Sequence, residues 1–186
     1  MNEFLQNLHL IYPLSPDLRE YLLEKLQVVI LPKKAFLLKE GRVCKNIYFI
    51  QRGLARCFYI KEDKEVSSWF MKEGDLIISV ESYFKQQPSY ENIQGIEECE
   101  LFCLSNDDLN VIYHKYPEFN FIARVLTEKY YTLSEQRLFS LRMQRASERY
   151  AYLMDHHPEI IQRVPSTFIA SYLGITLETL SRIKHG

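Results

Sequence analysis

The most specific pattern of the chain is Ile169-Ala170-Ser171-Tyr172-Leu173-Gly174-Ile175-Thr176-Leu177-Glu178-Thr179-Leu180-Ser181-Arg182-Ile183. Its spacing is typical of two short helices joined by a tight turn. A small residue, Ala170, lets the helices approach closely, and Gly174 supplies the positive φ of the turn. Thr176 is a suitable N-cap for the second helix. The pattern therefore predicts a helix-turn-helix whose core includes Ala170, Gly174, Leu180 and Ile183.

The outward side of this predicted unit carries residue types that bind DNA. Arginine bonds bidentately to guanine, glutamate accepts from cytosine, and serine or threonine bonds either base or phosphate. The start of the first helix would hold a phosphate. We therefore predict a DNA-binding surface made of Ser166, Thr167, Thr176, Leu177, Glu178, Thr179, Ser181, Arg182 and Lys184. An ordinary αα-hairpin with a polar outer face is the alternative.

Charge is distributed unevenly along the chain. Residues 1–136 contain 16 Lys/Arg and 20 Asp/Glu, whereas residues 137–186 contain 7 and 4. The net charge of −1 excludes a uniformly basic nucleic-acid binder. The positive excess at the C-terminal end favours a local anionic partner.

Residues 118–141 predict one long helix, because they lack Gly and Pro and their apolar residues recur at intervals of three and four. Such an apolar stripe needs a covering surface, either the chain's own strands or the same helix of a second copy. If a second copy covers it, we expect the interface to consist of Phe119, Ile122, Leu126, Tyr130, Leu133 and Arg137.

The N-terminal part has a different pattern. Residues 3–26 predict short helices broken near Pro13 and Pro16. Residues 28–104 contain many short apolar or alternating runs separated by turn signals. Short strands at such close spacing indicate an antiparallel barrel or sandwich.

In this order the parts resemble the Crp/Fnr superfamily of bacterial transcription regulators, from about Leu18 to Lys184. Gly41, Gly53 and Gly74 stand where that family places glycines. Glu178 and Arg182 match its recognition pattern Arg-Glu-x-x-x-Arg, whereas Leu177 replaces the first Arg.

The resemblance implies an α+β fold with three parts. Residues 1–117 would form N-terminal helices and an antiparallel β-roll of the cyclic-nucleotide-binding type, residues 118–141 a dimerisation helix, and residues 142–186 a helix-turn-helix DNA-binding domain. It also implies a homodimer that reads palindromic double-stranded DNA. Half-sites would lie about 34–36 Å apart, which is one duplex turn.

The roll departs from the nucleotide-binding members of that family. By resemblance, a Gly-Glu pair and an Arg-Ser-Ala string hold the phosphate, but here Gly74-Asp75 and Ser89-Tyr90-Glu91 stand in their places. A phosphate without an arginine fork is poorly bound, so we do not expect cyclic AMP. An unknown small-molecule effector and a roll filled by side chains both stay open. A ligand pocket would be lined by Trp69, Gly74, Asp75, Tyr83 and Tyr90.

The sequence lacks the residue clusters that a metal site or an enzyme would need. None of the histidines lies in the strand region 28–104, and the cysteines, Cys44, Cys57, Cys99 and Cys103, form no Cys-x-x-Cys. We therefore expect no metal site, no cofactor and no enzyme, and we expect the thiols to be free and buried.

The sequence contains no run of about 18 apolar residues and no basic secretory signal, so we expect a cytoplasmic protein without a membrane partner. The favoured function is a DNA-binding transcriptional regulator. The alternative is a β-roll module that senses a ligand or a partner protein without reading DNA. RNA polymerase would be a further partner, through a surface patch that no motif marks.

Overall fold

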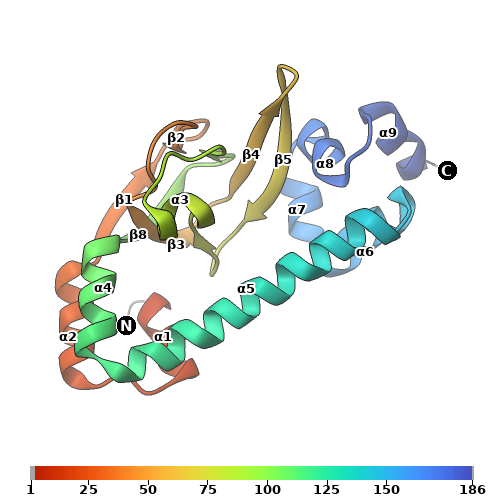
Figure 1. Ribbon diagram of the computed structural model, residues 1–186. Coiled ribbons are helices and arrows are strands. Elements are labelled where there is room, and N and C mark those ends of the chain that lie inside the picture. The colour runs from red at the N-terminus through yellow and green to blue at the C-terminus, as the bar shows by residue number, and fades with distance from the viewer. Residues whose placement is uncertain (1–2, 186) are drawn as a thin grey trace. The chain divides into compact units, whose positions relative to one another are not determined.

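The structure is a computed structural model that describes residues 3–185 (Figure 1). Its elements are α1 (Glu3–Ile11), α2 (Pro16–Lys25), β1 (Gln27–Leu31), β2 (Phe36–Leu38), β3 (Asn46–Arg52), β4 (Ala55–Lys61), β5 (Lys64–Met71), β6 (Leu76–Ile77), α3 (Val80–Lys85), β7 (Asn92–Gly95), β8 (Cys99–Ser105), α4 (Asn106–Lys115), α5 (Pro117–Met143), α6 (Ala146–His156), α7 (Pro158–Arg163), α8 (Ser166–Leu173) and α9 (Leu177–His185).

The N-terminal helices break where the prolines predict. α1 ends before Pro13, and α2 begins with Pro16 at its first turn. The N-cap of α2 is Ser15, whose Oγ accepts a hydrogen bond from the backbone N–H of Leu18 (3.3 Å). Proline suits the first turn of a helix because its missing N–H would have no partner there.

The strands form two antiparallel sheets, with the orders β1-β8-β3-β6 and β2-β7-β4-β5. One face of the β3–β8 pair carries the fully buried Ile50 and Leu101, which lie opposite each other. The other face carries Phe49 opposite Phe102, and α1 covers it with Phe4, whose ring centroid is 5.0 Å from that of Phe49. Side chains alternate between the faces of a strand, so this pair is buried on both sides. The predicted antiparallel β-roll is confirmed.

Gly53 lies between β3 and β4, where the chain has no room for a side chain. Its φ is +105°, and a Cβ built there would lie 2.4 Å from the backbone oxygen of Glu98 and 2.8 Å from the Cα of Cys99. Both obstacles are backbone atoms, so only glycine fits this connection.

The long helix after the roll agrees with its predicted place, since the predicted helix 118–141 is α5. The N-cap of α4 is Ser105, whose Oγ accepts from the Asp108 N–H (3.0 Å). The short helices α3 and α7 were not predicted.

The chain packs as two compact units. The first consists of the residues up to 56 together with residues 71–129. The second consists of residues 57–70, which make up most of the β4–β5 hairpin, together with the residues from 130 onward. The functional division into residues 1–117, 118–141 and 142–186 stays a prediction.

Candidate nucleic-acid interface

The turn between α8 and α9 has the geometry that its sequence predicts. Gly174 follows α8 in the left-handed conformation, with φ +68° and ψ +35°. The N–H of Ile175 donates to the oxygen of Ala170 (3.0 Å), which closes the last turn of α8. α9 then begins at an N-cap, because Thr176 Oγ1 accepts from the Thr179 N–H (3.2 Å).

A small apolar core holds α8 against α9. Ala170 and Leu180 are buried, and Ile183 is half-buried. Gly174, the remaining residue of the predicted core, is exposed, and it contributes a left-handed backbone conformation instead of a buried side chain. Ile169 and Leu173 are also fully buried and extend this core.

The outward residues of the α8–α9 pair lie where a partner can reach them. Of the predicted DNA-binding residues, only Thr179 is half-buried, and its Oγ1 lies 3.0 Å from Thr176 Oγ1. The exposed ones are Ser166, Thr167, Thr176, Leu177, Glu178, Ser181, Arg182 and Lys184. Lys184 Nζ donates to Ser166 Oγ (3.1 Å), which brings the start of α8 and the end of α9 together.

Glu178 and Arg182 lie one turn apart on α9, and both are exposed. Within residues 3–185 neither side chain makes a hydrogen bond or an ion pair. Their polar groups are therefore available to a ligand without first giving up an intramolecular partner.

Two arginines fasten the C-terminal end of α8. The guanidinium of Arg137 lies over the ring of Tyr172, 3.6 Å from its centroid, and donates to the Tyr172 backbone oxygen. The guanidinium of Arg149 donates to the Leu173 oxygen through Nε (3.1 Å) and Nη2 (2.7 Å). Cations at this end of a helix satisfy carbonyls that the helix itself leaves free. Burial lowers the pKa of Arg137 and raises that of Tyr172.

A serine joins α8 to the edge of β5. Ser171 Oγ donates to the Glu65 oxygen (3.0 Å) and accepts from the Ser67 N–H (2.9 Å). The ring centroids of Phe70 and Tyr172 are 5.0 Å apart, and Figure 1 shows β5 running beside α8. The hydroxyl thus replaces a neighbouring strand along part of an open sheet edge. Sequence reasoning missed this role because no local pattern links Ser171 to β5.

The predicted dimer face of α5 lies largely against the chain itself. Phe119 and Ile122 are 5% and 0% exposed. Leu126, Tyr130, Leu133 and Arg137 are half-buried, and Arg137 is held on Tyr172. The intramolecular covering thus applies to Phe119 and Ile122, and a dimer contact at the four half-buried residues stays a prediction. The other side of α5 in the second unit presents Tyr131, Leu138, Phe139 and Met143, all exposed.

The ligand pocket expected from Trp69, Gly74, Asp75, Tyr83 and Tyr90 stays a prediction. Asp75 is a turn residue whose Oδ2 accepts from the Lys72 N–H (3.0 Å), next to Gly74 with φ +87°. Tyr83 is buried, which raises its pKa, while Tyr90 is exposed. Trp69 belongs to the second unit and the other four residues to the first.

The roll contains a buried cation that the sequence analysis overlooked. Arg56 on β4 is 1% exposed, and its guanidinium donates to Gln94 Oε1 on β7 through Nη2 (2.8 Å) and Nε (3.3 Å). The hydroxyls of Ser79 and Ser89, which flank α3, lie 2.9 Å apart, and both residues are buried. Each of these two pairs of polar side chains thus bonds within the roll.

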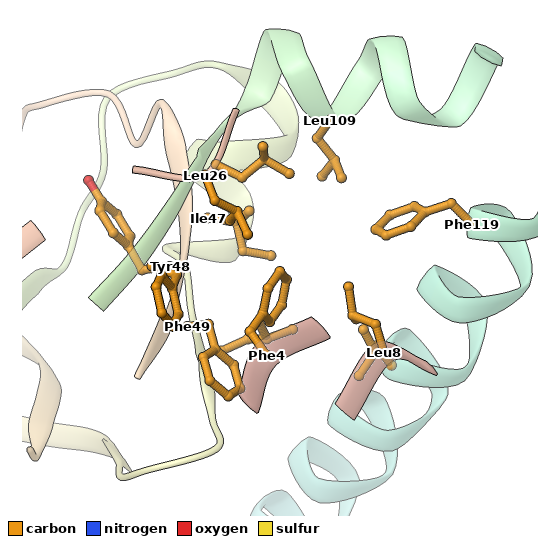
Figure 2. Close-up of a pocket in the computed structure, with 12 residues that line it drawn as sticks. Phe4, Leu8, Leu26, Ile47, Tyr48, Phe49, Leu109 and Phe119 are labelled. Carbon is orange, nitrogen blue, oxygen red and sulfur yellow. The ribbon is translucent and has the colours of Figure 1, made fainter. Parts of the chain in front are cut away.

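Figure 2 shows an apolar cavity of about 40 Å³ in the first unit. Phe4 and Leu8 reach it from α1 and Phe119 from α5, and its full lining is Phe4, Leu8, Leu26, Ile47, Tyr48, Phe49, Leu76, Phe102, Leu104, Leu109, Phe119 and Leu126. Clefts that hold drug-sized ligands have roughly 300–1,000 Å³. This cavity is therefore too small to hold a nucleotide.

Metal ligands do not cluster in the described chain. Within residues 3–185, no group of three or more His, Cys, Asp or Glu side chains is placed to hold a metal ion. Across the same residues, no helix combines the length and the apolar character needed to cross a membrane. The four cysteines are free and buried, as predicted.

Comparison with known proteins agrees with this architecture. Residues 28–116 match the family model of the cyclic nucleotide-binding domain. FixK2 from Bradyrhizobium japonicum has 18% sequence identity and a TM-score of 0.72, and the match covers 86% of this chain and 83% of FixK2. The catabolite activator protein of Thermus thermophilus has 19% identity and a TM-score of 0.59, with 95% and 84% covered.

The description of a third solved structure includes a family name. A protein from Eubacterium rectale, described as a transcriptional regulator of the Crp/Fnr family, has 14% identity, a TM-score of 0.71, and coverage of 92% and 82%. This chain has the Crp/Fnr fold. The fold expected from the resemblance is thereby confirmed, and residues 28–116 are the part that matches the cyclic nucleotide-binding domain model. No curated protein matches the sequence.

Proposed function

We propose that this Crp/Fnr-type chain is a cytoplasmic transcriptional regulator that binds double-stranded DNA through α8 and α9. The proposal rests above all on the pair of unpartnered side chains, Glu178 and Arg182, on the exposed face of α9. A glutamate accepts from cytosine and an arginine donates to guanine, so the two supply complementary readings of a base-pair edge.

The surroundings of α9 support the same function. Ser166 and Thr167 are exposed at the start of α8, where backbone N–H groups and the helix dipole favour a phosphate. Lys184 lies beside Ser166 and adds a positive charge at that end. In a helix-turn-helix, phosphate contacts of this kind fix the register of the second helix in the major groove.

We further propose that the protein acts as a homodimer through the exposed side of α5. Tyr131, Leu138 and Phe139 form an apolar surface there that a second copy would cover. A two-fold dimer reads a palindrome, with half-sites about 34–36 Å apart along the duplex.

The β-roll is proposed to act without a cyclic nucleotide. A phosphate needs a donor fork, and by resemblance Ser89-Tyr90-Glu91 stands in place of the Arg-Ser-Ala string that would supply it. An effector, if the roll takes one, would therefore lack a cyclic phosphate, and a contact with RNA polymerase would use another surface of the same dimer.

The test is selection of duplexes from a random DNA pool at near-physiological salt, because low salt rewards non-specific phosphate contacts. We expect enrichment of a palindrome with one-turn spacing. Arg182→Ala should weaken binding to that site by about 1–3 kcal/mol and leave binding to random DNA nearly unchanged.

Arg19→Ala is the matched control, since Arg19 is an equally charged, exposed residue that lies on α2, outside the α8–α9 pair. It should bind the selected site like the unmodified protein. An equal loss on selected and random DNA in Arg182→Ala would contradict a base-reading role.

A further inference from the structure

Each of the two sheets has two edge strands, and β1 differs from the other three. β6 has two residues, and β2 has three, with a register that shifts between Phe36 and Leu38. Part of the β5 edge is covered by Ser171. Short length, irregular register and a cover are common means by which sheets keep an edge from pairing. β1 is longer, and it pairs in regular register with β8 from Gln27 to Leu31.

The outer edge of β1 has backbone groups without a partner. Among residues 3–185, the backbone of Gln27–Leu31 forms hydrogen bonds only with β8. In an antiparallel pair, the N–H and C=O groups of alternate residues point away from the neighbouring strand. Figure 1 shows β1 at the left side of the roll, with no strand on its outer side. These outward groups are therefore available to an added strand.

The side chains of β1 also favour an added strand. Val28 and Ile30 are 59% and 54% exposed, and they lie on the same face because they are two residues apart. No residue of Gln27–Leu31 carries a charge, whereas charged side chains, lysine above all, normally keep an exposed edge from pairing. A strand beside β1 would cover this apolar face with its own alternate apolar side chains.

The charges at the two ends of β1 differ. Lys33 and Lys34 follow the strand, both are exposed, and within the described chain neither forms an ion pair. At the other end, Lys25 Nζ lies 2.8 Å from a carboxylate oxygen of Glu24. An added strand that runs antiparallel, as the strands of both sheets do, begins near the two unpaired lysines. Acidic side chains at its start would be attracted to them.

We propose that the edge of β1 binds an extended segment of a partner protein, which adds a strand antiparallel to β1. The segment carries acidic residues first and apolar residues at alternate positions after them. Backbone hydrogen bonds, apolar contact with Val28 and Ile30, and the charges of Lys33 and Lys34 together recognise it. The proposal does not depend on DNA binding by α8 and α9.

The probe is a display library of random peptides of about 12 residues, selected against the full-length protein. We expect enrichment of acidic-first peptides with alternating apolar residues, and one of them is then synthesised and titrated. Ile30→Lys should weaken its binding about tenfold or more, because an apolar contact is lost. Val111→Lys is the matched control, since Val111 is an exposed residue on α4 of the same unit. It should bind the peptide like the unmodified protein, and melting temperatures should show that both variants are folded.

Two further measurements test the charge and the backbone bonds separately. The double variant Lys33→Glu, Lys34→Glu should enrich basic-first peptides from the same library. N-methyl groups on one alternate set of the peptide's nitrogens would face β1 and should lower binding about tenfold or more. The same groups on the other alternate set face away from β1 and should leave binding nearly unchanged.

Several outcomes would overturn the proposal. Equal binding of the two N-methylated peptides would show that no strand is added. A library that enriches no peptide, or an equal loss in Ile30→Lys and Val111→Lys, would also reject the site. If β1 instead pairs with a second copy of the chain, Ile30→Lys changes the sedimentation coefficient of the protein alone, and the proposal is wrong. The selection of DNA duplexes is a separate measurement, so the proposed function stands in each of these cases.

Discussion

Gly53 and Gly41 both adopt positive φ, but their surroundings differ. A Cβ at Gly53 would strike the backbone of Glu98 and Cys99, whereas a Cβ at Gly41 would have nothing within 4 Å. We expect Gly53→Ala to lower the free energy of unfolding by about 2–5 kcal/mol, from strain and overpacking together. Gly41→Ala carries only the left-handed strain of about 1–2 kcal/mol. Urea unfolding compares the two, and equal losses would contradict the close approach at Gly53.

The buried thiol of Cys103 should make the free energy of unfolding depend on pH. Burial is the main cause that raises the pKa of its thiol from 9.0 to about 11. Between these two values the folded protein keeps a proton that the unfolded chain has released, so the free energy of unfolding falls as the pH rises through this window. Below pH 9 the thiol contributes no such dependence.

The measurement is urea unfolding at pH 8, 9, 10 and 11 for the unmodified protein and for Cys103→Ala. The decline across the window should be smaller in the variant, because the titrating thiol is gone. Cys44, whose pKa burial also raises, remains in both proteins. Parallel declines would show that Cys103 does not titrate in this window.

In the contact between α8 and β5, one hydroxyl serves two backbone groups. In Ser171→Ala, the bonds of this hydroxyl to the Ser67 N–H and to the Glu65 oxygen are both lost. Ser67 is buried and Glu65 is exposed, and an unpaired buried group costs about 1–3 kcal/mol, so we expect a loss of unfolding free energy in that range. Ser181→Ala removes an exposed hydroxyl from α9 and should unfold like the unmodified protein. Superimposable urea curves for all three would contradict the contact.

Local chemistry made most of the elements predictable. Pro13 and Pro16 divide α1 from α2, Gly174 ends α8, and Thr176 begins α9, each through interactions within a few residues. The α3 helix escaped prediction because its six residues are too few for a periodic pattern.

One part of the candidate site was predictable from local sequence, and another part was not. The turn and the exposed face of α9 follow from local sequence, so Glu178 and Arg182 were predictable. The bond from Ser171 to Ser67 joins residues 104 positions apart, and the Arg56–Gln94 bond joins residues 38 apart. Such pairs are set by tertiary packing, which one sequence does not encode in any local pattern.

The sequence also did not indicate which side of α5 would contact a second copy. A helical stripe of apolar residues indicates that something covers it, but it does not distinguish the chain's own core from a second copy. Burial of Phe119 and Ile122 answers that question for one side of the helix, and the exposed aromatic and aliphatic groups point to the other.

Assembly of the whole protein should therefore depend on the exposed side of α5. We expect Leu138→Asp to place a charge in the proposed dimer contact and to convert the protein to a monomer, as measured by sedimentation velocity. Its binding to the selected palindrome should fall towards that for a single half-site. Phe84→Asp, which changes an exposed side chain on α3, is the control and should sediment as a dimer. A Leu138→Asp variant that remains dimeric would reject this interface.

Because residues 57–70 pack with the C-terminal helices, the chain passes between its two units at residues 56/57, 70/71 and 129/130. A chimaera that moved only residues 142–186 onto another roll would separate Ser171 from its β5 backbone partners and Tyr172 from Phe70. The exchangeable part is instead discontinuous in sequence and includes the β4–β5 hairpin with residues 130–185. Recombination between relatives at a single crossover would thus break contacts that three crossovers, one at each passage between the units, would preserve.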